Sequence, residues 1–227
     1  RRGPSCHEAT FQSHLCSLAL ANVLFQRDCF ILHGSAVQLK DGAVVFIGDS
    51  GAGKTTLTAG LLRKNYPVLT EDATVIQIID GVAHVLPGLP YMKLGQKTVD
   101  LLGWNWEQLP PLYATVDRRA VLMEPQYLKD PVPLQAINVL ETSEEKPLIT
   151  WQEISSLEAK FSCLATHVHY QSFFVSYPLN ESYSDMAIRL AEQIPFHQIT
   201  RPAGKNTIED MLYMIVNNFN TLSLYTA

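Results

Sequence analysis

The sequence predicts one α/β domain over residues 1–227, and three observations favour this fold class. Apolar segments of strand length alternate with segments that have the periodicity of amphipathic helices. One of the strands runs directly into a glycine-rich loop that is followed by a helix, an order typical of α/β folds. No internal repeat, low-complexity tract or linker divides the 227 residues. A chain of this length can fold as one large domain around a single apolar core.

The composition excludes several classes of protein. With 47% hydrophobic and 17% charged residues, the chain is too apolar for intrinsic disorder, yet it has no window apolar enough to cross a membrane. The formal net charge of −5 provides no basic footprint for nucleic acid. The cysteines form no C-x-x-C pair, and we expect them to be reduced in a cytoplasmic protein. The chain begins with Arg1 rather than methionine, which leaves open whether residues precede it.

In the first third of the chain, apolar patterning and turn residues predict the elements. The apolar spacing around Gln12–Phe25 predicts an amphipathic helix. Two apolar runs then predict a β-hairpin, because the Lys40-Asp41-Gly42 turn between them is a common hairpin signal. A helix should follow the glycine-rich loop and end at Asn65-Tyr66-Pro67. The two hairpin strands and this helix are expected at Phe30–Leu39, Ala43–Ile47 and Lys54–Lys64.

The next segments predict a short buried strand, Val68–Thr70, and a second hairpin turned by Asp80-Gly81. Residues 87–134 are rich in proline, so we expect loops and short strands there, around one helix. These and the later elements are expected at Thr74–Ile79, Val82–Leu86, Gln96–Leu102 (helix), Arg118–Met123, Ile137–Leu140, and at the three helices Ser155–Thr166, Tyr183–Ile194 and Thr207–Phe219.

Residues 48–55 match the phosphate-binding pattern G-x-x-x-x-G-K-[ST] without departure. Glycines let backbone amides curl around phosphate oxygens, and the helix that starts near Lys54 points its free N–H groups at the same anion. Lys54 can reach the β- and γ-phosphates, and the Thr55 hydroxyl can bind Mg²⁺. The alternative, a glycine-rich turn before an ordinary helix, is disfavoured by the strand before the loop. The predicted nucleotide-binding residues are Gly48, Asp49, Ser50, Gly51, Ala52, Gly53, Lys54, Thr55 and Thr56.

An acidic pair, Glu71-Asp72, follows the short buried strand. The strand after the loop helix usually lies beside the loop strand, so its carboxyl end should open at the same edge of the sheet. Two carboxylates there can divide the work, one holding the metal or its water and the other accepting a proton. Because side chains alternate along a strand, both reach the site only if the strand has already ended. The alternative is that one of them caps a turn before Ala73.

Three histidines are candidates for a catalytic or metal-binding role. His33 interrupts an apolar strand, and a lone histidine in a strand is more often structural than catalytic. His167 and His169 form an H-x-H pair that could place two metal ligands on one strand face. No third ligand is near them in the sequence, so a structural role is favoured for this pair as well.

Three segments together resemble the C-terminal kinase domain of HPr kinase/phosphorylase. They are His33-Gly34, the loop Gly48–Thr55 and the strand with its acidic pair, Val68–Asp72, at similar spacing. The pattern is most similar to the small members of that family, some of which phosphorylate a serine of a lasso-peptide precursor. Weaker similarity extends through Leu89–Leu94, Pro133–Leu140, Thr200-Arg201-Pro202 and the last helix.

The resemblance implies a P-loop kinase domain related to phosphoenolpyruvate carboxykinase, with a central mixed sheet flanked by helices. It also implies ATP and Mg²⁺ as cofactors and a serine of a peptide or small protein as acceptor. By position it assigns Glu71 as the general base, His33 as the residue that tunes the base, and Asp72 as the metal-associated carboxylate beside Thr55. Lys54 would hold the phosphates. The bacterial regulators of the family are hexamers, which leaves a homo-oligomer open.

The sequence departs from the family pattern in three respects. Glu71 stands where the family usually has aspartate, and Thr55 replaces the more usual serine while keeping the hydroxyl that Mg²⁺ needs. The glycine-rich segment associated with dephosphorylation is not found, so the resemblance implies a one-way kinase.

Other residues could contact the transferring phosphate or the acceptor. Arg118 and Arg119 precede an apolar strand and are more simply interpreted as solvated edge residues. The loop from Arg201 to Lys205 could touch a phosphate or an acidic substrate. The aromatic segment Trp104–Trp106, near Tyr113, could form a peptide-binding wall or pack in the core.

The leading interpretation is therefore an ATP- and Mg²⁺-dependent serine kinase that acts on a peptide or small protein. Two alternatives stay open. One is a kinase for a small hydroxylated metabolite, which a panel of acceptors would reveal. The other is a non-catalytic module in which the nucleotide orders loops around a partner, and tight binding without turnover would reveal it.

Overall fold

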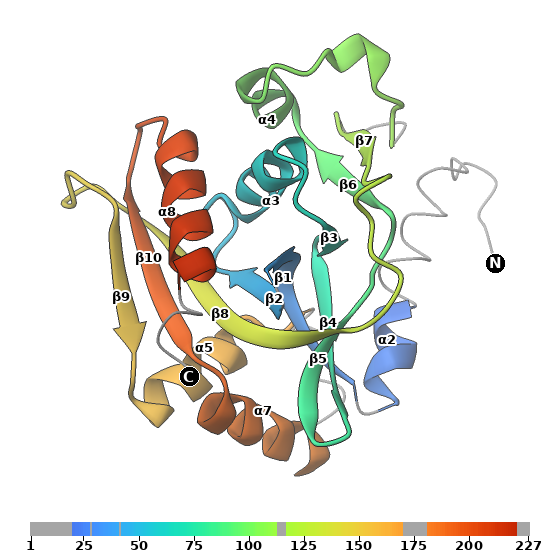
Figure 1. Cartoon of the computed structure of the whole chain (residues 1–227), viewed down its shortest axis with the longest axis vertical. Helices are drawn as coiled ribbons and strands as arrows, with labels where there is room; N and C mark the ends of the chain where they lie inside the picture. The colour runs from blue at the N-terminus through green and yellow to red at the C-terminus, as the bar shows by residue number, and fades with distance from the viewer. Residues whose placement is uncertain (1–19, 28, 41, 113–116, 170–180, 222–227) are drawn as a thin grey trace.

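The computed structural model describes residues 20–27, 29–40, 42–112, 117–169 and 181–221. Within these ranges, strands of a mixed sheet occupy the centre and helices cover both of its faces (Figure 1). None of the described helices is both long and apolar enough to span a membrane. The strands are β1 (Phe30–Leu39), β2 (Gly42–Ile47), β3 (Val68–Thr70), β4 (Ala73–Ile79), β5 (Val82–Leu86), β6 (Tyr91–Leu94), β7 (Arg119–Leu122), β8 (Val132–Ser143), β9 (Thr150–Ile154) and β10 (Phe196–Pro202). The helices are α2 (Leu20–Phe25), α3 (Lys54–Arg63), α4 (Gln96–Leu101), α5 (Leu157–Thr166), α7 (Glu181–Gln193) and α8 (Ile208–Thr221), with a 3₁₀ turn η2 (Trp106–Gln108).

Strand β1 pairs with three other strands. Its second half is antiparallel to β2 on one edge, with Gly34 opposite Ile47, and to β3 on the other edge, with Ala36 opposite Thr70. Its first half is antiparallel to β4. Because β2 and β3 both run antiparallel to β1, they run parallel to each other and their carboxyl ends lie at the same end of the sheet. The prediction that β3 lies beside β2 is wrong, since β1 lies between them.

Strand β8 joins the two parts of the sheet. Its beginning is antiparallel to β5, its middle is parallel to β2, and its second half is parallel to β10, which in turn pairs with β9. The strands β1, β4, β5, β8 and β2 thus form a closed ring of pairings, and β10 and β9 extend it. The strand predicted at Ile137–Leu140 lies within β8 and covers only part of it.

The alternation of side chains along β2 divides the apolar core into two. Val44 and Phe46 pack with residues of α3 and α8, whereas Val45 and Ile47 pack with residues of α5 and α7. Figure 1 shows these two helix pairs on opposite sides of the central strands. Every residue of β2 is buried, which explains why its sequence is continuously apolar rather than alternating.

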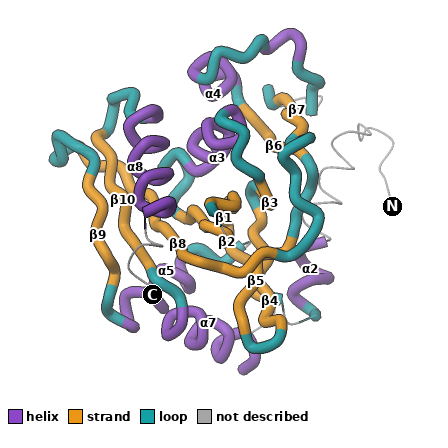
Figure 2. The backbone as a smooth tube through the Cα atoms, viewed as in Figure 1, coloured by secondary structure: helices purple, strands orange, loops and turns teal. Residues whose placement is uncertain are grey.

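Strands β6 and β7 form a separate two-stranded antiparallel sheet, and the chain between them contains α4 and η2 (Figure 2). Met92 and Leu94 of β6 are fully buried in the same core as α3. Lys93 lies between them and therefore points to the opposite face of the strand. Trp106 is buried in this core and Trp104 packs against it, so the aromatic segment has the packing role rather than forming an exposed wall.

The predicted elements within the described residues agree with the observed ones to within two residues at their ends, except at β8. Of the helix predicted at Gln12–Phe25, Leu20–Phe25 is observed and the rest lies outside the described residues. Tyr113 and the centre of the Lys40-Asp41-Gly42 turn lie outside them too. Strands β9 and β10 were not predicted, and β6 lies in the segment 87–134, where short strands were expected without bounds.

Candidate active site

Glycines fix the shape of the loop between β2 and α3. Gly48, Gly51 and Gly53 have φ values of 142°, 87° and 110°, a region that residues with a side chain rarely adopt. A Cβ atom on Gly48 would also lie 2.3 Å from the carbonyl oxygen of Leu140. The glycines that the sequence pattern specifies are therefore required by this backbone.

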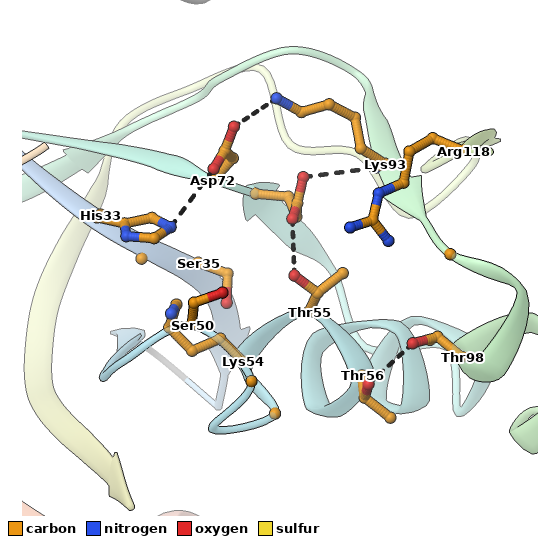
Figure 3. A pocket seen from close by; sticks show the side chains of 15 residues that line it. His33, Ser35, Ser50, Lys54, Thr55, Thr56, Asp72, Lys93, Thr98 and Arg118 are labelled. Carbon is orange, nitrogen blue, oxygen red and sulfur yellow. Dashed lines mark hydrogen bonds and ion pairs between the residues drawn. The ribbon is translucent and has the colours of Figure 1, made fainter. Parts of the chain in front are cut away.

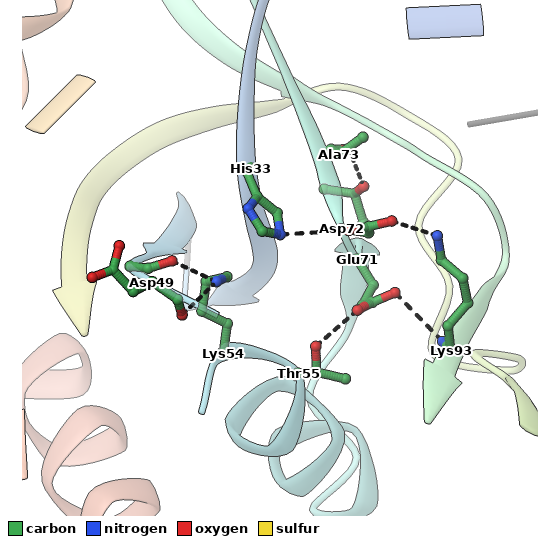
Figure 4. A network of polar contacts seen from close by, with 10 residues as sticks. His33, Asp49, Lys54, Thr55, Glu71, Asp72, Ala73 and Lys93 are labelled. Atoms are coloured by element: carbon green, nitrogen blue, oxygen red, sulfur yellow. Dashed lines mark hydrogen bonds and ion pairs between the residues drawn. The ribbon is translucent and has the colours of Figure 1, made fainter. Parts of the chain in front are cut away.

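The start of α3 is suited to an anion. Gly53 is the N-cap residue and offers no side chain to the first N–H groups of the helix, which leaves them for a ligand. The Lys54 ammonium folds back over the loop, 2.5 Å from the carbonyl oxygen of Gly48 and 3.2 Å from that of Asp49 (Figure 4). Burial lowers the pKa of Lys54, against the opposing effect of nearby carboxylates. A phosphate would give this ammonium a charged partner in place of neutral carbonyls.

The position of β1 explains why residues far apart in the sequence meet here. Strand β2 ends at Ile47, opposite Gly34 of β1, and β3 ends at Thr70, opposite Ala36. His33 immediately precedes Gly34 on the intervening strand. The strand pairing therefore places His33 between the phosphate-binding loop and the acidic pair.

The chain leaves β3 in a bend that brings both carboxylates to one pocket. Asp72 has a φ of 75°, a left-handed conformation that aspartate tolerates better than most residues. The Thr70 hydroxyl donates a 2.6 Å hydrogen bond to the carbonyl oxygen of Ala73 across the bend. Because the strand has ended at Thr70, alternation no longer separates the two side chains, and both Glu71 and Asp72 line the same cavity.

The Glu71 carboxylate faces the first turn of α3. The Thr55 hydroxyl donates a 2.8 Å hydrogen bond to Oε1, and the backbone N–H of Lys93 donates to Oε2 at 3.4 Å (Figure 4). Burial, and after it the negative charge of Asp72, raises the pKa of Glu71 to about 7. A cation bound beside Thr55 would favour the charged form of this carboxylate.

Asp72 lies between a lysine and a histidine. The Lys93 ammonium donates to Oδ2, and His33 Nε2 lies 3.6 Å from Oδ1. Burial by itself would raise the pKa of Asp72, but the charge and hydrogen bond of Lys93 lower it on balance. Burial and the nearby Lys54 ammonium lower the pKa of His33. At neutral pH, Asp72 is therefore an anion next to an uncharged imidazole.

These groups surround a polar pocket of about 430 Å³ (Figure 3), a volume in the range of small-ligand sites. All three predicted catalytic residues line it: His33, Lys54 and Glu71. The predicted metal-associated residues Thr55 and Asp72 line it as well. Of the predicted nucleotide-binding residues, Ser50, Gly51, Gly53, Lys54, Thr55 and Thr56 line this pocket, whereas Gly48, Asp49 and Ala52 line a second cavity of about 220 Å³ beside β8.

Four residues form the facing wall of the pocket, and for three of them the sequence had predicted no role in the site. Lys93, Gly95, Thr98 and Arg118 of the segment from β6 to β7 line the pocket, and the Thr98 hydroxyl lies 3.0 Å from that of Thr56. A Cβ atom on Gly95 would lie 2.3 Å from Nη1 of Arg118, although the φ of −88° suits any residue. Glycine at this position thus leaves room for the guanidinium. A basic residue in the otherwise apolar β6 was the one sequence signal for Lys93, and none marked Thr98.

The arginine pair before β7 splits between two environments. Arg118 is exposed, as expected for a solvated edge residue, and it also lines the pocket, because β6 pairs with β7 and Gly95 makes space for it. The Arg119 guanidinium instead lies over the ring of Trp106, 4.4 Å from its centroid. Only the first of the two is placed to meet a phosphate in this pocket.

The other two basic candidates contact backbone carbonyls. Arg201 donates to the carbonyl oxygens of Ala52 at 3.1 Å and Gly51 at 3.3 Å, and so supports the phosphate-binding loop without lining the polar pocket. Lys205 donates to the carbonyl oxygen of Pro147 at 3.4 Å.

The H-x-H pair does not lie on one strand face, as a metal site there would require. His167 ends α5, and the ring of His169 packs against that of His33 with centroids 5.9 Å apart. Burial lowers the pKa of His169 to about 4, although the charge of Asp72 opposes this. Among the residues that the structure describes, no group of three or more His, Cys, Asp or Glu side chains could hold a metal ion.

Comparison with known proteins finds similarity among solved structures, where 59 chains match. No protein-family model matches the sequence, and no curated protein matches it. Among solved structures, the HPr(Ser) kinase/phosphatase from Coxiella burnetii is similar over 86% of this chain and 97% of that chain, with a TM-score of 0.45 and 10% sequence identity. A similarity this low does not indicate a function, so the function is inferred from the geometry of the site.

Proposed function

We propose that the chain is an ATP- and Mg²⁺-dependent kinase that phosphorylates a serine of a peptide or small protein. One observation carries the proposal: a phosphate-binding loop, a carboxylate bonded to the loop threonine and a second carboxylate beside a histidine line one pocket. Phosphoryl transfer to a hydroxyl uses a loop that holds the phosphates, oxygen ligands for the metal and a base for the hydroxyl, and this pocket offers groups of each kind. The sequence resemblance supplies a candidate acceptor, a ribosomally made peptide precursor of the lasso-peptide kind.

The loop and α3 would bind the phosphates of ATP. The backbone amides of the loop and the Lys54 ammonium carry this role, as in other P-loop enzymes. Thr55 and Glu71 offer the hydroxyl and carboxylate oxygens that Mg²⁺ prefers, and their 2.8 Å hydrogen bond puts both next to the same point. When bound, the metal would neutralise charge on the phosphates. These donors fit the metal.

The contacts favour an exchange of the roles that the resemblance assigned to the two acids. Glu71 bonds to Thr55, so it suits the metal side of the site, whereas Asp72 lies beside His33. In the proposed step, the acceptor oxygen bonds to the γ-phosphorus, the bond from that phosphorus to the bridging oxygen of ATP breaks, and the hydroxyl proton passes to Asp72. A weakly basic aspartate is sufficient, because little proton transfer is needed early in a loose transition state.

Two cations face the loop from the other wall. Lys93 pairs with Asp72, and Arg118 enters the pocket past Gly95. Negative charge spreads over the equatorial oxygens of the transferring group, so preorganised cations on this side would stabilise the transition state. We assign this role to Arg118, and to Lys93 the role of holding Asp72 ionised.

The test is mass spectrometry of acceptors after incubation with Mg·ATP. The panel holds an HPr protein, peptides with an internal or C-terminal serine, and free serine. Wild type is compared with Lys54→Ala and with Lys205→Ala, a lysine outside the pocket that contacts only the Pro147 carbonyl in the described contacts. We expect a gain of phosphate on a peptide or protein that Lys54→Ala loses and Lys205→Ala keeps.

Each contrary outcome has a definite meaning. Phosphate on a small hydroxylated compound alone would replace the peptide kinase with a metabolite kinase. Tight nucleotide binding with no turnover on any acceptor or water would favour the nucleotide-gated module. Failure to bind nucleotide would overturn the proposal as a whole.

A further inference from the structure

An apolar cavity of about 120 Å³, distinct from the cavity beside β8, shares part of its wall with the polar pocket. Glu71, Asp72 and Lys93 line both. The remaining lining is almost entirely apolar and comes from α2, from β1 and β4, from the end of β3 at Thr70, and from the chain between β5 and the start of β6. It includes Leu20, Leu24, Ile31, Val75, Leu89 and Tyr91.

The connection from β5 to β6 is fixed in place, so the cavity exists before any ligand arrives. The backbone N–H of Gly88 donates to the carbonyl oxygen of Leu69 at 2.8 Å, and the Tyr127 hydroxyl donates to the carbonyl oxygen of Gly88 at 2.8 Å. A Cβ atom on Gly88 would lie 2.4 Å from the Thr70 hydroxyl. The wall of the cavity is thus held against the end of β3, next to the acidic pair.

The opposite rim is an exposed leucine. Ile31 and Val75 are buried and form a small apolar cluster against which Leu24 packs. Leu20, one turn earlier on α2, is 46% exposed even though it lines the cavity. An apolar group that entered the cavity would cover this leucine, and the removal of its surface from water would favour binding.

The volume of the cavity limits which groups could bind in it. Sites for whole small molecules usually measure about 300–1,000 Å³, so this cavity is too small for one. It suits one hydrophobic side chain that belongs to a longer chain. Asp72, the proposed base, lines both cavities. An extended peptide spans about 3.3–3.6 Å per residue, so a peptide with one side chain in this cavity would bring a serine hydroxyl one or two residues away to Asp72.

We propose that the apolar cavity binds a hydrophobic side chain of the peptide acceptor, next to the serine that receives the phosphate. The proposal rests on the proposed function and specifies its substrate: a peptide with a leucine-like residue within two positions of the serine. The polar pocket then holds the nucleotide, and the shared wall of Glu71, Asp72 and Lys93 lies where the two substrates meet.

The test uses two peptides of equal length and charge, in which the residues beside the serine are leucine or glutamine. We expect the leucine peptide to have at least about a tenfold higher kcat/KM, the discrimination typical of a hydrophobic pocket. Two variants of the full chain change the cavity: Leu20→Asp makes its rim charged, and Leu89→Ala widens it. Leu148→Asp, at a leucine that is 74% exposed in the β8–β9 connection, is the matched control.

The variants should raise the KM for the leucine peptide about tenfold, while nucleotide affinity and the glutamine peptide change little. The Leu148 variant should resemble wild type. A binding assay separates docking from chemistry: a fluorescent leucine peptide with alanine in place of the serine should bind wild type in the presence of a non-hydrolysable ATP analogue, and bind Leu20→Asp more weakly.

Three results would overturn the proposal. Equal use of the two peptides would remove the side-chain preference while leaving the kinase intact. Unchanged KM in both variants would place the acceptor elsewhere. Transfer to a small hydroxylated compound alone would remove the peptide. If wild type neither binds nor hydrolyses ATP, the proposed function itself fails, and the peptide-binding assay still decides whether the cavity accepts a leucine.

Discussion

The Thr55 hydroxyl donates a 2.8 Å hydrogen bond to the Glu71 carboxylate, which connects the first turn of α3 to the bend after β3. The two residues are sixteen positions apart, and the strand β1 lies between the strands that precede them. This contact places a carboxylate where the phosphate-binding loop offers its hydroxyl. It also leaves the second acid, Asp72, to interact with His33 and Lys93.

Glu71→Gln should weaken the use of Mg²⁺. The amide keeps the shape of the side chain but removes the charge next to Thr55, so the Mg²⁺ concentration for half-maximal activity should rise about 10- to 100-fold. ATP binding without metal should change little. Titration of activity against Mg²⁺ measures the effect, with the exposed Glu153→Gln as control. A lower kcat with an unchanged Mg²⁺ requirement would return the base role to Glu71.

Asp72→Asn should lower kcat by about 10²–10⁴-fold, the contribution of a general base, with the Mg²⁺ requirement unchanged. Single-turnover kinetics measures the effect. Asp80→Asn is a matched control, because Asp80 also has a positive φ, 50°, and lies outside the pocket. Full activity of Asp72→Asn would rule out the proposed proton transfer.

Gly95→Ala should disturb the site through Arg118. The new methyl group would occupy the space of the guanidinium, so this variant and Arg118→Ala should each lower kcat by about 10²-fold, the cost of losing one charge-stabilising donor. The double variant should be no worse than either single variant, since the two act through the same group. Additive losses in this cycle would show that Gly95 matters for another reason.

The stability of the metal-free protein should depend on pH through Glu71. Its pKa is raised from 4.5 to about 7, so the folded state holds this proton more tightly than the unfolded state. The free energy of unfolding should therefore fall as the pH rises from 4.5 to 7, by on the order of 3 kcal/mol from this group.

The buried His169 acts in the opposite direction over part of this range. Its pKa is lowered to about 4, so it destabilises the fold as the pH falls below its ordinary value of 6.5. The difference between wild type and Glu71→Gln isolates the carboxyl group. Urea unfolding of both proteins in EDTA from pH 4.5 to 8 measures it, and parallel curves would contradict the assignment.

Gly48→Ala should destabilise the fold far more than Gly51→Ala. Both glycines have positive φ, so each alanine costs on the order of 1 kcal/mol in backbone strain. At Gly48 the methyl group also meets the Leu140 carbonyl oxygen at 2.3 Å, whereas at Gly51 no heavy atom lies within 4 Å. Urea unfolding of the two variants measures the difference. Equal losses would mean that the loop relaxes away from β8.

The sequence was most informative where local pattern alone determines structure. The continuous apolar run of β2, the glycines after it and the helix from Lys54 are specified by neighbouring residues, and all were predicted. The acidic pair was predicted as well, because the end of a strand can be located from the sequence. His33 could not be placed from pattern alone, since its importance depends on the strand that separates the loop from the pair.

The features of the fold and of the site that were not predicted depend on which strands pair with each other. That β1 rather than β3 lies beside β2 is set by which strands meet, and local periodicity does not encode this order. Lys93 and Arg118 reach the pocket only because β6 pairs with β7, 25 positions away in the sequence. Strand β10 contains His197, Gln198 and Thr200 between its apolar residues, so its sequence gave no clear strand pattern.

The two walls of the polar pocket differ in how firmly they are anchored. In β1, residues 35–37 pair with β2 on one edge, and Ala36 and Val37 also pair with β3 on the other edge. The backbone amides of these residues should therefore exchange with solvent only on global unfolding. The wall with Lys93 and Arg118 belongs to a two-stranded sheet, which has fewer strand pairings than β1 and depends on the packing of Met92 and Leu94 in the core for its stability. If the pocket binds a nucleotide as proposed, we therefore expect that wall to adjust to it, while the loop, His33 and the acidic pair stay in place.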